Sequence, residues 1–438
     1  MTVPGPTYAE MQDPRLLPAS FRQRVLAARE RELDPLNLFN ITWRRPDGRV
    51  NYVVLPEGLT GVEANLIVLL GRDFPSGSHK VGPVYTTLLE AEVGARASPE
   101  RHTLVGPSTG NFGIGTAYIA RLKGYRAIIV MPDSMSRERY DRIRRYGGEL
   151  DLTPGTESDV ILTLERTHAA YMRRPEYLVL EQFSLLPNYR FHRHVTGRAA
   201  LEAAAAEGNG RVALFVAAPG SAGTLAAGDE IKAAHPDALV AAPEPRECPT
   251  LYSNGVGQHR IEGVGDKMVT LIHNVRSTDY VLLIHDEDCL WGLVGVQETP
   301  LAGMLGISSV ANIMAAVTMA QHLGLGRGDN VVTVATDGFD RYPSVIEDLR
   351  HRAGRQFQSQ MVRWCAMPFA PSTPAEILDV RGREQQDRLH HQKQAVWTRL
   401  GYPEALLDRM RSRDYWDEEA GLAADVDRRY AEMRDPLV

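Results

Sequence analysis

The stretch Leu66-Ile67-Val68-Leu69-Leu70 leads into the polar turn Pro75-Ser76-Gly77-Ser78-His79-Lys80, and this pair of segments decides how we interpret the fold. A continuous apolar run bounded by turn residues predicts a strand that is buried on both faces. An amine held at the end of such a strand loses hydration, which lowers its pKa and suits it to Schiff-base chemistry. A solvated loop lysine is the alternative that this stretch alone leaves open.

Short apolar runs alternate with helical stretches from Leu66 to about Arg350. Further strands are predicted at 103–105, 127–131, 177–182, 212–217, 238–242, 280–284 and 331–335, and helices at 84–93, 112–123, 135–146, 158–172, 192–207, 225–234 and 309–323. This alternation indicates an α/β fold with doubly wound parallel sheets. In such sheets ligands bind beyond the carboxyl ends of the strands.

The two ends of the chain differ from this core. Residues 1–60 are rich in Pro, Arg and Glu, with one helical pattern at 21–31 and an extended segment at 38–43, and they predict an N-terminal extension. Residues 61–352 form the expected catalytic core of two lobes, the smaller at about 100–200. Residues 353–438 are charged and helix-forming, which predicts a helical C-terminal extension.

Composition excludes several classes of function. The 438 residues carry a formal net charge of −6, so no basic excess is available for a nucleic acid partner. Cys248, Cys289 and Cys365 lack the spacing of a disulfide framework or a metal site. No run is long and apolar enough to span a membrane, and no export signal is evident. We therefore expect a cytoplasmic protein.

Two glycine-rich loops between a strand and a helix are suited to anions. Ser108-Thr109-Gly110-Asn111-Phe112-Gly113 offers hydroxyls and backbone N–H groups for a carboxylate or a phosphate, although Ser108 or Thr109 could instead be a helix N-cap. Pro219-Gly220-Ser221-Ala222-Gly223-Thr224 suits a single phosphate group. A dinucleotide site is disfavoured, because the glycine order is G-x-x-G-x-G and no acidic residue ends the next strand.

The order of these elements resembles the fold-type II pyridoxal-phosphate enzymes, and most closely the cysteine synthase and cystathionine β-synthase family. The resemblance covers about residues 66–342. It is carried by the lysine turn, both glycine loops and further motifs in register, which are Met131-Pro132-Asp133-Ser134-Met135-Ser136-Arg137-Glu138-Arg139, Gln182-Phe183, His259-Arg260-Ile261-Glu262-Gly263-Val264-Gly265 and Gly306-Ile307-Ser308-Ser309.

The resemblance implies a role for each matching residue. Lys80 would form the internal aldimine with pyridoxal 5′-phosphate and then carry the substrate α-proton, while Asn111 would bind the phenolic oxygen of the cofactor. The phosphate would lie on Gly220, Ser221, Ala222, Gly223 and Thr224, and the substrate carboxylate on Ser108, Thr109, Gly110 and Gln182. A homodimer is also implied.

The activity that the resemblance implies is β-replacement on serine or an O-activated serine, through an α-aminoacrylate, with a thiol or sulfide as co-substrate. β-Elimination, as in serine/threonine dehydratases or diaminopropionate ammonia-lyases, is the alternative. Two further alternatives come from other classes of protein. One is an NAD-dependent oxidoreductase, and the other is a regulatory relative that binds no cofactor.

Three positions depart from the family pattern. Phe112 replaces a small hydroxyl residue, and Ala222 replaces a glycine of the phosphate loop, which is a mild change if its φ is negative. The serine that meets the pyridine nitrogen in the family falls on Asp337. A carboxylate there would keep that nitrogen protonated. The alternative is that Thr336 meets the nitrogen and Asp337 caps a turn.

Overall fold

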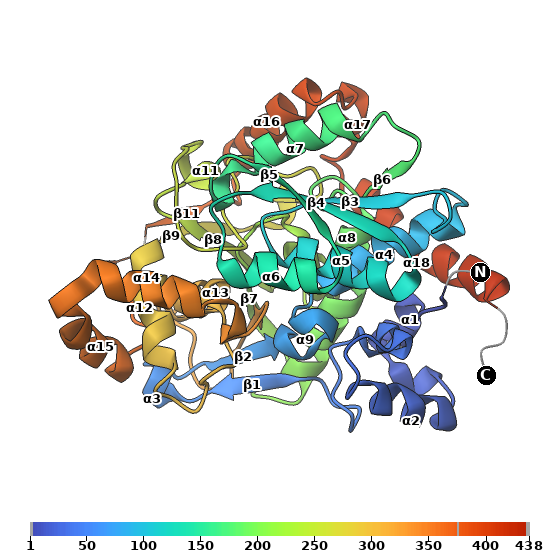
Figure 1. Cartoon of the computed structure of the whole chain (residues 1–438). Helices are drawn as coiled ribbons and strands as arrows, with labels where there is room; N and C mark the ends of the chain where they lie inside the picture. Colours follow the sequence, from blue (N-terminus) through green and yellow to red (C-terminus); the bar gives the residue numbers. More distant parts are fainter. Residues whose placement is uncertain (1–2, 375, 435–438) are drawn as a thin grey trace.

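The computed structural model describes residues 3–374 and 376–434, which form two sheets surrounded by helices (Figure 1). The larger sheet has seven strands in the order β1-β2-β10-β7-β8-β9-β11, and the smaller has four in the order β5-β4-β3-β6. This confirms the α/β class with parallel sheets. All eight strands expected from the sequence are present.

The larger sheet is parallel in its centre and antiparallel at both edges. Its strands are β1 (Tyr52–Leu55), β2 (Asn65–Leu70), β10 (Asn330–Ala335), β7 (Val212–Val216), β8 (Leu239–Pro245), β9 (Tyr280–Ile284) and β11 (Ile377–Asp379). Ile67 and Leu69 of β2 join one buried apolar cluster, whereas Leu66 and Val68 join another. The strand is therefore buried on both faces, as its continuous apolar sequence predicts.

The smaller sheet is parallel throughout. It consists of β3 (Thr103–Pro107), β4 (Arg126–Pro132), β5 (Glu149–Thr153) and β6 (Tyr177–Val179). Helices α5 (Asn111–Lys123) and α7 (Val160–Ala170) both pack on β3 and β4. The glycine loop that begins at Ser108 thus joins a strand to the N-terminus of a buried helix.

The helices follow the expected pattern, with boundaries shifted by a few residues. Those of the core and its C-terminal border are α3 (Glu57–Thr60), α4 (Val81–Val93), α6 (Arg137–Arg145), α8 (Pro187–Phe191), α9 (Gly197–Ala205), α10 (Ala226–Ala234), α11 (Thr250–Ser253), α12 (Asp286–Val296), α13 (Ile307–His322), α14 (Pro343–Ala353) and α15 (Phe357–Ala366). A π-helical turn at His192–Thr196 precedes α9, within a stretch that the sequence predicts as one helix.

The N-terminal extension packs on the core rather than standing apart. It contains α1 (Tyr8–Gln12) and α2 (Ala19–Ala28). The segment expected to be extended, 38–43, is helical in its first half: residues Pro35–Asn40 form a 3-10 helix, because Pro35 fixes the first turn and Asp34 caps it through the Leu36 N–H.

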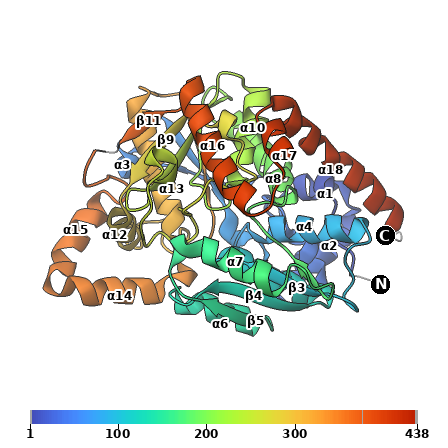
Figure 2. The ribbon, with the colours of Figure 1, turned by 90° about the horizontal axis from the view of Figure 1, so that it is seen from above.

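The C-terminal segment packs on two parts of the molecule, the larger sheet and the N-terminal helices. It adds β11 to the larger sheet, a strand that the sequence does not predict, and continues through α16 (Arg383–Arg399), α17 (Glu404–Arg409) and α18 (Arg413–Met433). Helices α1 and α18 lie side by side, far from α14 and α15 at the other end of the molecule (Figure 2). Asp427 of α18 accepts hydrogen bonds from the backbone N–H groups of Tyr8 and Ala9. No described helix is long and apolar enough to cross a bilayer.

Candidate active site

Lys80 lies at the start of α4, directly after the turn that follows β2. The turn is tight, since Ser76 and Gly77 both have left-handed φ values of 62° and 76°. The Lys80 side chain is buried, and its Nζ lies 3.4 Å from Ser221 Oγ in the glycine loop that begins α10. Burial lowers the pKa of this amine to about 8, although the charges of Asp266 and Glu157 oppose the shift. The amine is therefore buried and partly neutral near physiological pH.

Asn111 and Asp337 come together from the two sheets. Asn111 begins α5, and its Nδ2 donates to Asp337 Oδ2 at 2.6 Å, while its Oδ1 accepts from Arg341 Nε at 2.7 Å. Tyr342 also donates to Asp337, at 3.0 Å. The Asp337 side chain is fully buried and lies against Gly306, where any larger residue would collide with it. Asp337 is therefore part of a fixed polar network close to the turn of Lys80.

The second glycine loop lies between β7 and α10, with Lys80 next to it. A side chain at Gly220 would meet the Gly263 carbonyl, and one at Gly223 would meet Asn188 Oδ1, so both positions require glycine. Ala222 has φ of 62°, which is the left-handed region, rather than the negative φ that would make its replacement of glycine a mild change. The loop holds a strained alanine at the N-terminus of a helix, where anions bind.

Asn188 is a site residue that the sequence analysis missed. Its Nδ2 donates to Ser221 Oγ at 3.0 Å and to the Gln182 carbonyl at 2.8 Å. Its Oδ1 is buried without a hydrogen-bond partner in the described residues. Asn188 therefore joins the glycine loop to the segment that contains Gln182. An asparagine next to Pro187 carries no sequence signal of this role.

The first glycine loop brings Ser108, Thr109 and Gly110 beside Asn111. Ser108 Oγ accepts hydrogen bonds from the backbone N–H groups of Gly110 and Gly113, at 3.0 and 2.9 Å. Ser108 thus satisfies backbone N–H groups at the start of α5, although the N-cap residue itself is Gly110 rather than Ser108 or Thr109. Thr109 Oγ1 donates instead to Glu157 Oε1. Gln182 is buried close to Asn188, and its backbone carbonyl accepts the hydrogen bond from the Asn188 side chain.

Two buried carboxyl groups face Lys80, and neither belongs to the expected site. Glu157 lies in the 3-10 turn before α7, and Asp266 follows the motif that ends at Gly265. Burial raises the pKa of both carboxyls, and the charge of Glu157 raises that of Asp266 further, whereas Lys80 lowers both. Single acidic residues in loops are too common in sequences for either position to be recognised.

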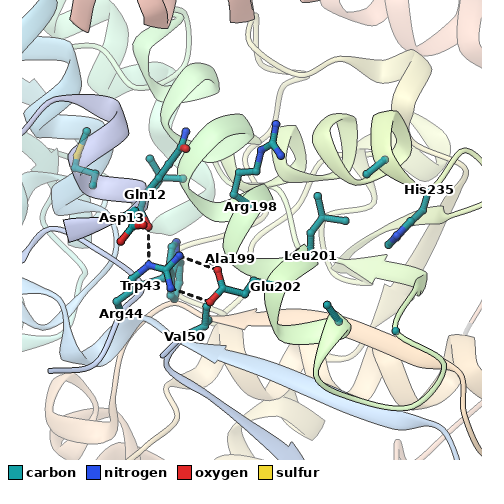
Figure 3. Close-up of a pocket in the computed structure, with 15 residues that line it drawn as sticks. Gln12, Asp13, Trp43, Arg44, Val50, Arg198, Ala199, Leu201, Glu202 and His235 are labelled. Atoms are coloured by element: carbon teal, nitrogen blue, oxygen red, sulfur yellow. Dashed lines mark hydrogen bonds and ion pairs between the residues drawn. The ribbon is translucent and has the colours of Figure 1, made fainter. Parts of the chain in front are cut away.

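Another pocket lies away from these residues. It has a volume of about 490 Å³ and lies between the N-terminal extension and α9 (Figure 3). Arg44 forms an ion pair with Glu202 across it at 2.7 Å, and Trp43, Arg198 and His235 also line it. None of the site residues expected from the sequence lines this pocket. The volume of a pocket therefore does not identify the candidate active site in this protein.

Comparisons with known proteins identify the family of the chain. The family model described as "Pyridoxal-phosphate dependent enzyme" matches residues 59–337, a span that begins before β2 and ends at Asp337. The chain belongs to this family. A cysteine synthase of Staphylococcus aureus is 32% identical over 289 residues, which cover 64% of this chain and 88% of that protein.

Two solved structures show the same fold. A hydrogen sulfide-producing enzyme of Fusobacterium nucleatum is 25% identical, covers 66% of this chain and 95% of its own, and has a TM-score of 0.62. An O-ureido-L-serine synthase is 27% identical, covers 67% of this chain and 90% of its own, and has a TM-score of 0.60. The protein therefore is a pyridoxal-phosphate-dependent enzyme that acts on amino acids, and the oxidoreductase alternative is wrong.

The residues present fit the cofactor of this family. A buried amine with a lowered pKa lies beside a loop whose glycines keep a concavity open at a helix N-terminus. Asn111 retains a second amide N–H after donating to Asp337, and so can bind another oxygen. This chain brings these three features together from both lobes.

Proposed function

We propose that this enzyme catalyses β-replacement on a serine-type amino acid, with a thiol or sulfide as the incoming nucleophile. The observation that carries the proposal is the position of the Lys80 amine, which is buried 3.4 Å from Ser221 of the glycine loop. The named relatives support it, since one is a cysteine synthase and another an O-ureido-L-serine synthase. Both names describe compounds with a substituent on the β-carbon of alanine.

We assign the cofactor contacts as follows. Lys80 would attach the cofactor, and Asn111 would donate to its phenolic oxygen. The backbone of the loop would hold the phosphate, through the residues Gly220, Ser221, Ala222, Gly223 and Thr224. Asp337 would meet the pyridine nitrogen, since its carboxylate is fully buried beside Asn111, whereas Thr336 is only half-buried. When bound, pyridoxal phosphate supplies an electron sink for the α-carbon of the substrate.

The chain's own groups would then bind the substrate and move its protons. Free N–H groups at the start of α5, together with Thr109 and Gln182, would hold the substrate carboxylate and so orient the bond from Cα to its hydrogen. The Lys80 Nζ would accept that proton, because a pKa of about 8 leaves an appreciable neutral fraction at neutral pH. Burial of the site would exclude water from this exchange.

Two wider expectations accompany this proposal. The residue ranges 1–60, 61–352 and 353–438 would act as extension, catalytic core and extension, with the smaller lobe at about 100–200. A homodimer is expected from the family resemblance alone, and a cytoplasmic location from the cysteine usage and the lack of an evident export signal. Sedimentation of the purified enzyme tests the dimer.

The proposal is tested first at Lys80. Borohydride reduction of the holoenzyme followed by peptide mapping should place a pyridoxyl group on Lys80, and Lys80→Ala should lower turnover by at least about 10³-fold. Serine, O-acetylserine and O-phosphoserine are each offered with sulfide, and the products are identified by mass spectrometry. Incorporation of sulfur at the β-carbon is the expected result.

Two results would contradict the proposal. Release of pyruvate and ammonia from every donor, without incorporation of sulfur, would show that the enzyme catalyses β-elimination instead. Attachment of the pyridoxyl group to another lysine would remove the observation on which the proposal depends.

A further inference from the structure

Glu157 and Asp266 bring two carboxyl groups to the site from opposite lobes. Thr109, in the loop assigned to the substrate carboxylate, donates through its hydroxyl to Glu157 Oε1. Glu157 also lines a pocket of about 390 Å³ with Ser136, His259 and other residues, so it lies where a small molecule can reach it. The Glu157 carboxyl is thus in contact with the substrate loop.

Asp266 lies on the other side, next to the loop assigned to the phosphate. The Gly265 N–H donates to the Pro219 carbonyl at 2.9 Å, and the Thr270 hydroxyl donates to the Ser221 carbonyl at 2.8 Å, which fixes the segment between them. Asp266 lines a small pocket together with Pro219 and Gly220. The segment therefore places a carboxyl group beside the glycine loop that contacts Lys80.

Each of these carboxyls has an oxygen without a partner. Glu157 Oε2 and Asp266 Oδ2 are buried and make no hydrogen bond within the described residues, and the two side chains belong to residues only 3% and 6% exposed. A buried polar atom left unpaired destabilises the folded state. Buried polar atoms without a partner occur in functional sites, where a bound ligand supplies the missing hydrogen bond.

Two cations act on this pair. Arg139 forms its ion pair with Glu262, but its charge also lowers the pKa of Glu157, and more strongly than Lys80 does, whereas Lys80 is the cation that lowers the pKa of Asp266. Burial raises the pKa of both carboxyls, and that of Asp266 stands well above its usual range. Burial thus favours the protonated form of each acid, and the charge of Glu157 adds to this effect at Asp266.

We propose that Glu157 and Asp266 together act as the general acid that protonates the group leaving the β-carbon, and that the amino-acid substrate is serine with its hydroxyl unactivated. This inference rests on the proposed β-replacement. Hydroxide is a poor leaving group, and it departs as water only if a proton reaches its oxygen. An O-acetyl or O-phospho group leaves without one, and a phosphate dianion would be repelled by the acidic pair.

The step balances without another reactant. The bond from Cβ to oxygen breaks with its electron pair on oxygen, the carboxyl O–H gives its proton to that oxygen, and water departs. The incoming thiol forms the bond from sulfur to Cβ and gives its S–H proton back to the carboxylate. Serine and a thiol thus yield a cysteine thioether, or cysteine from hydrogen sulfide, and water.

The test compares leaving groups in the holoenzyme. In E157Q, D266N and the double variant, kcat/KM for serine should fall by about 10²–10³-fold, which is the usual contribution of a general acid. The loss with O-acetylserine should be much smaller, so that the ratio of the two values shifts by at least about 30-fold. Asp159→Asn is the matched control, because Asp159 lies in the same turn but pairs with Lys267. This control variant should change kcat/KM for serine and for O-acetylserine by the same factor.

A binding measurement separates this role from a structural one. The non-reacting anion 2-amino-3-phosphonopropanoate is titrated into the holoenzyme by calorimetry. Its Kd should fall at least about tenfold in the double variant, because two buried acids no longer repel it. Variants that merely disturb packing would weaken binding of this probe, and that result would overturn the inference.

The outcomes also separate this inference from the proposed function. If O-acetylserine supports β-replacement in the unaltered enzyme but serine does not, the general acid is wrong and the proposed function holds. If no donor yields a β-substituted product, the proposed function itself fails. An equal loss with serine and O-acetylserine in E157Q and D266N would overturn the general acid as well.

Discussion

Trp43 of the N-terminal extension donates through its indole Nε1 to the hydroxyl of Thr196, at 2.9 Å. Thr196 ends the π-helical turn before α9, and its hydroxyl also bonds His192 at 2.9 Å. The Trp43 ring lies 5.5 Å from the ring of His79, the residue that precedes Lys80. The N-terminal extension therefore packs against the turn that positions Lys80.

Replacing Trp43 should weaken both the fold and the retention of the cofactor. Trp43→Phe removes the hydrogen bond and should cost about 1 kcal/mol of unfolding free energy, whereas Trp43→Ala should cost about 3–5 kcal/mol. Urea unfolding measures the loss, and dialysis measures the Kd of the cofactor. Trp291→Phe is the control, since this tryptophan bonds Glu287 within α12 and should destabilise without releasing cofactor.

The lowered pKa of Lys80 should make the apoenzyme more stable as the pH rises into the alkaline range. From pH 8 to about 10.5 the unfolded chain holds a proton that the folded chain has lost, so the unfolding free energy rises with pH. The unfolding free energy of Lys80→Met should exceed that of the unaltered apoenzyme by up to about 3 kcal/mol at pH 7. This difference should vanish above pH 10.5. Urea unfolding at three pH values measures it. A variant less stable at every pH would refute this account.

Ala222 should be a position where stability can be gained. Its left-handed φ of 62° costs an alanine about 1–2 kcal/mol, which glycine avoids at a smaller entropic cost. Ala222→Gly should therefore raise the unfolding free energy by up to about 1 kcal/mol. Ala233→Gly, at an exposed helical position of α10, should lower it by about 1 kcal/mol. Thermal unfolding of both holoenzymes measures the contrast, and a loss of stability in both would show that Ala222 is not strained.

The sequence predicts the central strands well, because a strand buried on both faces needs a continuous apolar run, such as Leu66–Leu70. Edge strands carry no such run, which is why β1 and β11 escape the sequence analysis. The glycine loops and Lys80 are recognisable because their chemistry requires particular residues at fixed spacing.

The acids of the site are not predictable in this way. Glu157 and Asp266 act on each other electrostatically only after two lobes pack together, and nothing in their local sequence records that proximity. The same holds for Asn188, whose partners Ser221 and Gln182 come from different segments. The φ of Ala222 is likewise set by the path of the loop rather than by its own residue type.

Asp337 should determine the electronic state of the bound cofactor. Asn111 and Tyr342 both donate to it, and Arg341 Nε lies 3.9 Å from its Oδ2, so the surrounding donors hold its side chain in one orientation. A carboxylate would hold a proton on the pyridine nitrogen, whereas a serine hydroxyl would not. Asp337→Ser should therefore alter the visible absorbance of the bound cofactor and lower kcat at least about tenfold.

The control for this change is Asp340→Ser. Asp340 lies three residues further along, pairs with Arg341 and Arg142, and is half exposed. Its loss should leave the absorbance of the cofactor in place, because its charge is outside the buried network. Absorbance titrations of both holoenzymes from pH 6 to pH 9 measure the difference. If Asp337→Ser has the spectrum and the turnover of the unaltered enzyme, the pyridine nitrogen meets another group, and Thr336→Val then becomes the substitution that should change the spectrum.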